Sequence, residues 1–233
     1  MALPKLNGNP KYEMLIPSKQ QTVRFRPYLV KEEKVLLMAF ESQDTTQAMK
    51  AIIDTIEVCV DDKIDKKELT TFDVEYMFTK LRSKSVGERS KLNMSCQKCN
   101  TKNEITVDLE AIELNMDNPS ETIDLQEEVF VEMGYPSADV LMNMKEGLSQ
   151  TEQLIELIVY SIKNILTEDE NINANDVSKD DLRDFVDSMT GEQFKKVSEF
   201  VATIPTLTQD VEFDCRECGT HNKTTLSGFT DFF

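Results

Sequence analysis

Two C-x2-C pairs, far apart in the chain, most constrain what this sequence can fold into. The first pair is Cys96 and Cys99, and the second is Cys215 and Cys218. Zinc in structural sites binds four ligands in a tetrahedron, and one such pair can supply two of the four corners. The spacing therefore predicts one closed structural zinc site to which both pairs contribute.

The two pairs begin similar short sequences. From each first cysteine the chain reads CQKCNTKN and CRECGTHN, so Thr101 corresponds to Thr220, and Asn103 corresponds to Asn222. The similarity does not continue further along the chain. It is a short internal echo rather than a long repeat.

The flanks of both pairs have the pattern of β-strands, because apolar residues alternate with polar ones. The alternating apolar residues are Leu92, Met94, Ile105, Val107, Leu109, Val211 and Phe213. Each pair is therefore expected at the tip of a β-hairpin, with the two hairpins facing each other across the metal. Gly219 and Asn100 follow the two pairs and suit the positive φ that such turns require.

Other uses of the cysteines are weaker interpretations. Disulfides are rare in the reducing cytosol, which is where an acidic chain without a signal peptide is expected. Neither pair ends a strand that opens a helix, as a thioredoxin-like redox site would. Cys59 lies on an apolar helical stripe and is expected in the core, and His221, the single histidine, is an alternative ligand. Metal shared between two subunits, as a zinc-bridged dimer, also stays open, and with it the oligomeric state.

Composition excludes several classes of function. The chain of 233 residues has 43 acidic and 26 basic residues and a formal net charge of −17. Such a charge repels nucleic acid and anionic membranes. No apolar run approaches the ~18 residues of a membrane span. Met1–Lys5 has no apolar signal-peptide core, so a cytoplasmic protein is expected.

The remaining periodicity predicts an α+β protein of small antiparallel hairpins and amphipathic helices. We expect an N-terminal arm over 1–11 and a hairpin with helices over 12–90. A zinc-ribbon sheet is expected to be split between 91–134 and 206–233, with a helical insertion over 135–205. Metal that joins the two halves of the sheet would stabilise the fold.

Individual helices are predicted from caps and apolar stripes. The segment 31–42 is apolar over so wide an arc that a well-buried helix is expected. The helix that begins after Ser149 is expected to continue to Ile165. The expected N-caps and their partners are Asp44 with Gln47, Ser149 with Glu152, Thr190 with Gln193, and Thr70 and Ser178 without a partner.

Sites of other kinds have weaker signals. Residues 169–180 place oxygen-bearing side chains at several EF-hand positions, but Ala174 replaces the glycine and Asp180 the glutamate, so a polar loop before a helix cap is the alternative. No nucleophile motif or glycine-rich phosphate loop is present, which indicates a non-enzymatic protein. The three phenylalanines near the C-terminus, Phe229, Phe232 and Phe233, are expected to dock in the protein's own core or on a partner.

The segment VRFRPYLVKEEKVLLMA, residues 23–39, is followed by a C-x2-C pair, a helical middle, a second C-x2-C pair and an aromatic end. This arrangement resembles the baseplate hub assembly proteins of T-even-type contractile-tailed bacteriophages. The resemblance implies a structural or assembly protein that binds other baseplate and hub proteins in the host cytoplasm. It leaves open whether the protein stays in the virion tail baseplate. Arg24 and Arg26 share a strand face that could meet an acidic partner or pair internally.

Two further functions are held as alternatives. The first is a zinc-ribbon adaptor that binds nucleic acid or polymerase, which would require a basic patch. The second is a metal-dependent hydrolase, which would require a zinc with an open coordination position.

Overall fold

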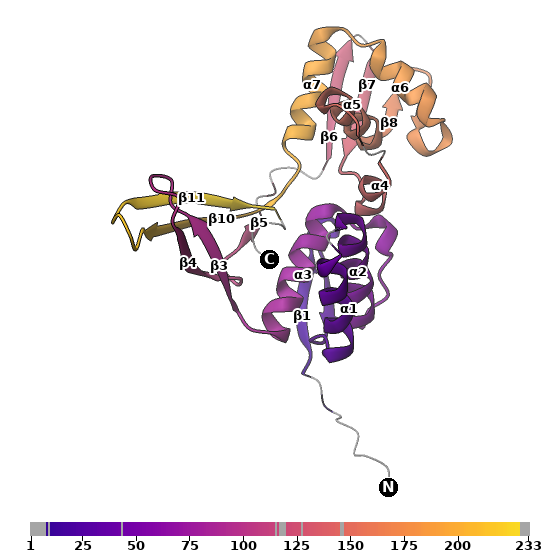
Figure 1. The fold of residues 1–233 in the computed structure, drawn as a ribbon. Coiled ribbons are helices and arrows are strands. Elements are labelled where there is room, and N and C mark those ends of the chain that lie inside the picture. The colour runs from indigo at the N-terminus through magenta and orange to yellow at the C-terminus, as the bar shows by residue number, and fades with distance from the viewer. Residues whose placement is uncertain are drawn as a thin grey trace. The chain divides into compact units, whose positions relative to one another are not determined.

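The chain divides into two compact units. The computed structural model describes residues 8, 10–42, 44–114, 116, 120–126, 128–144 and 147–228. The first unit comprises residues 1–66, 72–115 and 206–233, and the second comprises residues 67–71 and 116–205 (Figure 1).

The first unit contains three long helices and three small groups of strands. Its helices are α1 (Val30–Glu41), α2 (Thr45–Cys59) and α3 (Thr71–Ser85), with 3-10 turns at Pro17–Lys19 and Lys66–Glu68. Its strands are β1 (Tyr12–Ile16), β2 (Gln21–Phe25), β3 (Arg89–Ser95), β4 (Lys102–Asp108), β5 (Glu113–Leu114), β10 (Leu207–Asp214) and β11 (His221–Ser227).

The N-terminal hairpin is confirmed. β1 and β2 pair antiparallel with Met14 opposite Val23, and the 3-10 turn at Pro17 joins them. Met14, Val23 and Phe25 are buried in the core of the first unit. The hairpin is anchored to α3 because the backbone N–H and the hydroxyl of Ser18 donate to the buried carboxylate of Asp73 at 2.8 and 2.6 Å.

The expectation that the segment 31–42 is a well-buried helix is wrong. The helix forms as α1, but its inner face buries only Leu36 and Glu32, while most of its other apolar side chains are exposed. Arg26 belongs to this inner layer, because its Nη2 lies 3.0 Å from Glu32 Oε1. Of the two readings of Arg26, the internal ion pair is therefore the one that the structure shows.

The helices α2 and α3 form as predicted. The carboxylate of Asp44 accepts the Gln47 N–H at 3.0 Å and caps α2. Their inward residues are buried together with the hairpin. These core residues are Ile52, Ile56, Cys59, Phe72, Val74, Met77, Phe78 and Leu81.

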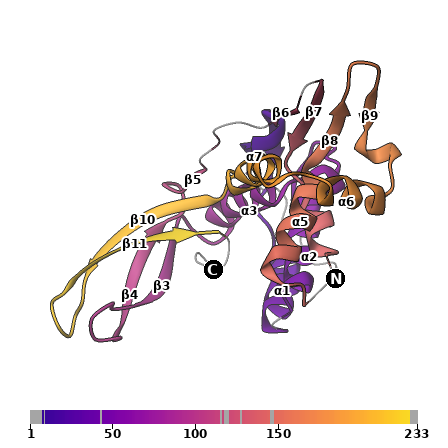
Figure 2. The same cartoon turned by 90° about the horizontal axis from the view of Figure 1, so that it is seen from above.

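The second unit is a four-stranded antiparallel sheet with helices on one face (Figures 1 and 2). Its strands lie in the order β6 (Ser120–Gln126), β7 (Val129–Gly134), β8 (Ile162–Leu166) and β9 (Asn171–Asn173). Its helices are α4 (Ala138–Met142), α5 (Gln150–Ser161), α6 (Lys179–Asp187) and α7 (Gly191–Ala202), with a 3-10 turn at Ala174–Asp176.

This sheet corrects the expected boundary of the insertion. The segment 120–134 was assigned to the zinc-ribbon sheet, but β7 pairs with β8, with Val131 opposite Ile165. The insertion therefore begins near residue 116 and is mixed rather than helical. Alternation predicts a strand but does not say which strand will pair with it.

A second correction concerns the predicted helix that begins at Ser149. Ser149 and Glu152 do form a capping box, but α5 ends at Ser161 and the chain continues as β8. Ile158, Ile162 and Ile165 fit a helical period, yet β-branched residues also suit a strand, and pairing with β7 and β9 decides the outcome. The caps at Ser178 and Thr190 are confirmed.

Parts of both chain ends lie outside the described residues. Most of the expected arm over 1–11 and the three C-terminal phenylalanines lie outside the described residues. Among the helices of the described ranges, none combines the length and the apolar character that crossing a bilayer requires.

Candidate metal centre

Two β-hairpins carry the cysteines at their tips. β3 pairs with β4 up to Ser95 opposite Lys102, and β10 pairs with β11 up to Asp214 opposite His221. The hairpins lie side by side in both views although they come from opposite ends of the insertion (Figures 1 and 2). The prediction that each pair forms a hairpin tip is confirmed.

The four sulfurs gather at one point. Their Sγ atoms all lie within 4.8 Å of one another, with Cys96 3.7 Å from Cys218 and Cys99 3.6 Å from Cys215. Four sulfurs at ~2.3 Å from one zinc ion would lie ~3.8 Å apart, so these separations fit a tetrahedral site. They are far longer than the ~2.05 Å of a disulfide, and all five cysteines are free thiols.

Each turn is closed by the same backbone pattern. The Asn100 N–H donates to the Cys96 carbonyl, and the Gly219 N–H donates to the Cys215 carbonyl, both at 2.9 Å. Asn100 has φ +57° and Gly219 has φ +67°. The positive φ expected at these two positions is therefore confirmed.

The sequence echo has a structural reason that sequence reasoning missed. The side-chain oxygen of Asn222 accepts the backbone N–H of Gln97, and that of Asn103 accepts the backbone N–H of Arg216, both at 2.9 Å. Each asparagine is buried and spans from its own hairpin to the turn of the other. The recurrence of asparagine at the same offset was the available signal.

The remaining echo residues contact the sulfurs. Thr101 Oγ1 lies 3.3 Å from Cys99 Sγ, and Thr220 Oγ1 lies 3.2 Å from Cys218 Sγ. A threonine hydroxyl can donate a hydrogen bond to a thiolate. The four echoed positions therefore join the two turns and support their ligands.

Backbone amides favour the thiolate form. The Cys218 N–H, followed by the Glu217 N–H, lowers the pKa of Cys215 to about 6. The Cys99 N–H lowers the pKa of Cys96, and the Lys98 N–H lies 3.4 Å from its sulfur. Thiolates are the form that binds zinc, so the lowered pKa values of Cys96 and Cys215 suit a metal site.

The other candidate ligands lie elsewhere. Cys59 lies on the buried face of α2, where burial raises the pKa of its thiol to about 11. His221 Nδ1 lies 2.9 Å from Asp214 Oδ1, on the exposed side of the hairpin. The four cysteines form the only cluster of potential metal ligands in the described part of the chain.

The EF-hand-like segment is a hairpin instead of a cation loop. Asn171 and Asn173 pair with Leu166 and Asn164 along β9 and β8. Ser178 caps α6 by accepting the Asp181 N–H at 3.1 Å. Residues 171–173 are extended as β9 and residues 174–176 form a 3-10 turn, so the segment does not curl around one point as a cation loop does.

Two sets of contacts hold the cysteine-bearing hairpins, β3–β4 and β10–β11, to α3. A buried cluster of Val107, Leu109, Ile112, Leu207 and Leu226 joins the bases of both hairpins, and Tyr76 of α3 packs against it. Glu110, just after β4, accepts the Ser83 hydroxyl at 2.6 Å and the Lys80 ammonium at 2.9 Å. The metal centre therefore rests on the helical part of the first unit.

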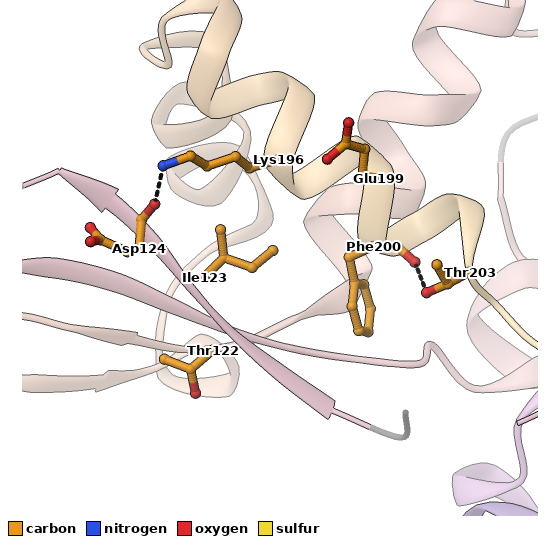
Figure 3. Close-up of a pocket in the computed structure, with 7 residues that line it drawn as sticks. All are labelled: Thr122, Ile123, Asp124, Lys196, Glu199, Phe200 and Thr203. Atoms are coloured by element: carbon orange, nitrogen blue, oxygen red, sulfur yellow. Dashed lines mark hydrogen bonds between the residues drawn. The ribbon is translucent and has the colours of Figure 1, made fainter. Parts of the chain in front are cut away.

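A cavity of about 420 Å³ lies in the second unit between β6 and α7 (Figure 3). Lys196 donates to the backbone carbonyl of Asp124 at 2.7 Å, and Gln193 donates to that of Leu125 at 3.1 Å. These two hydrogen bonds join α7 to the C-terminal half of β6. The residues that line the cavity include no cysteine or histidine.

Comparison with known proteins gives one match. The sequence model of a family described as T4 bacteriophage base plate protein matches residues 9–233. Comparisons with curated proteins and with solved structures returned no significant match.

Proposed function

This chain belongs to the family of T4 bacteriophage base plate proteins, and on that premise we propose that it acts without enzymatic activity in assembly of the baseplate hub. The observation that carries the proposal is the extent of the family match, which takes in both hairpins and the insertion between them. The working surfaces of such a protein are contacts with other baseplate and hub subunits. It would act in the host cytoplasm while the tail is built.

The zinc site supports this proposal as a structural element. Cys96, Cys99, Cys215 and Cys218 are the proposed ligands, and four thiolates fill a tetrahedral zinc completely. A filled site holds two hairpins together but offers no position for water or substrate. This argues for a scaffold rather than for a metal-dependent hydrolase.

Electrostatics disfavours the adaptor alternative. On the two hairpins Lys91 pairs with Glu104 at 2.8 Å, and Lys223 pairs with Glu212 at 3.0 Å. These lysines are balanced by neighbouring acids instead of forming the basic stripe that nucleic acid requires. A gel shift at low salt should show no binding of DNA or RNA, and binding there would favour the adaptor.

The assembly role is tested in the phage. Deleting the gene should leave host lysis intact but yield heads without tails by electron microscopy, and a plasmid copy should restore infectivity. Cross-linking of a tagged chain during infection should join it to hub subunits. Complete tails in the deletion lysate would contradict the proposal, and cross-links confined to non-hub subunits would contradict the hub assignment.

The metal is tested by native mass spectrometry with and without a chelator. We expect one zinc per chain, lost together with the compact charge states. A compact, zinc-free chain would contradict the structural zinc but would leave the assembly role standing.

A further inference from the structure

The outer face of α1 concentrates exposed apolar surface. Nine large apolar side chains are exposed in the described chain, and six of them lie between Leu29 and Phe40. Val30 and Met38 are each 70% exposed, and Leu37 is 53% exposed. A helix that is apolar on both faces is normally covered on both. The outer face of α1 therefore lacks the cover that its composition requires.

The charges on this face change sign along the helix. At 3.6 residues per turn, Lys34 and Glu41 lie on the same side of α1 as Met38. Lys31 also lies there, and its ammonium is 3.2 Å from Glu32 while its side chain stays 70% exposed. Within the described ranges, neither Lys34 nor Glu41 has an ion-pair partner in its own chain. The face is thus basic in its first half and acidic at its end.

We propose that the outer face of α1 binds the same face of a second copy, with the two helices antiparallel and crossing at Leu37 and Met38. Lys34 and Glu41 are equally far from this crossing point along the helix. A two-fold axis there places Lys34 opposite Glu41 of the partner subunit, and the reverse pair forms by symmetry. The apolar side chains then pack at the centre, with an ion pair on each side.

The charge order favours a second copy over an acidic partner. A purely acidic segment would satisfy Lys31 and Lys34 but would repel Glu41. Only a face with both signs, in the opposite order, matches the whole helix. The net charge of −17 on each copy opposes association, but physiological salt screens charges beyond ~8 Å and leaves the contact pairs in place.

The dimer should be weak. A helix of 12 residues is ~18 Å long, so two of them form a small interface. We expect a dissociation constant on the order of 10 µM, as for other interfaces at the small end of the range. The inference does not rest on the proposed assembly role, because the surface is argued from exposure and charge alone.

Sedimentation velocity of the zinc-loaded chain tests the dimer. From about 1 to about 200 µM the protein should pass from monomer to dimer. Met38→Glu should weaken dimerisation at least about tenfold by placing a charge at the crossing point. Val86→Glu is the matched control, because Val86 is similarly exposed but follows α3, and it should change nothing. Circular dichroism checks that both variants fold.

Charge reversal tests the antiparallel arrangement. Lys34→Glu should weaken the dimer, because two like charges then face each other, and adding Glu41→Lys in the same chain should restore it. A wild-type chain that stays monomeric at the highest concentration would overturn the proposal. So would a dimer that survives Met38→Glu. A double variant that stays as weak as Lys34→Glu would overturn the antiparallel pairing.

Discussion

At the scale of single residues, the arrangement of the four cysteines depends on two asparagines as well. Asn103 and Asn222 each satisfy a backbone N–H in the opposite turn, and each also donates to a threonine carbonyl in its own turn at 2.7 Å. A buried amide that uses both ends in this way holds the turns in one relative position. The same position is the one in which the four sulfurs meet.

Asn222→Ala should destabilise the first unit and weaken zinc binding. The substitution leaves the Gln97 N–H, whose hydrogen bond is partly buried, without its acceptor, and this costs about 1 kcal/mol. Loss of a residue that orients ligands should also lower zinc affinity about tenfold. Thermal unfolding and chelator competition measure the two effects. Asn93→Ala, at an exposed position on β3, is the control, and equal behaviour of the two variants would contradict this role.

At the scale of elements, Glu110 binds the cysteine-bearing hairpins to α3. Burial would raise the pKa of Glu110, but hydrogen bonds from Ser83 and Lys80 outweigh it and lower the pKa to about 2. Lys84 adds a further ion pair at 3.3 Å. A pKa lowered in the folded state means that ionised Glu110 stabilises the protein above its unfolded pKa, and that this stability is lost as pH falls toward about 2.

Glu110→Gln should therefore cost stability in a pH-dependent way. At pH ~7 we expect a loss of about 1 kcal/mol, because the carboxylate is partly exposed to solvent. The difference in unfolding free energy between the variant and the wild type should narrow below pH ~4.5, where protonation of Glu110 begins to remove the same interaction from the wild type. Urea unfolding at several pH values measures this difference in free energy. Glu88→Gln, which removes a more exposed carboxylate from Lys84, should cost less. A gap that does not change with pH would contradict the account.

At the scale of the whole molecule, two separate cores divide the chain. The four clustered cysteines and the α1–α3 helices belong to the first unit, whereas β6–β9 and α5–α7 have their own core in the second. That second core includes Val131, Ile158, Leu182 and Val197. Stabilisation by metal should consequently be confined to the unit that binds it.

Removal of the metal should affect the two units differently. After chelation, hydrogen exchange should accelerate in β3, β4, β10 and β11, because the tips of the two hairpins lose the metal that links them. Exchange in α5, α7 and β7 should stay unchanged. Cys218→Ser should reproduce the effect of the chelator. Equal acceleration in both units would show that the metal stabilises the whole chain.

Local chemistry explains what could be predicted. Some residues interact only with neighbours a few positions away, so their spacing in the sequence was sufficient to predict them. These are the paired cysteines, the turn residues Asn100 and Gly219, and the helix cap Asp44. The metal cluster was also predictable, since two half-sites complete one tetrahedron. The reciprocal asparagines were visible only as an echo, because their partners lie in the other hairpin.

The two cysteine hairpins, the helix caps and the acidic character of the chain follow from the order of residues alone. Three features depend on contacts between distant segments: Ile162–Leu166 is a strand, β6 and β7 belong to the insertion, and α1 exposes its apolar outer face. The physical reason is that a cap or a metal half-site is set by neighbours in sequence. Strand pairing and burial depend on which distant segment offers a partner, and for the outer face of α1 no described segment of the first unit does so.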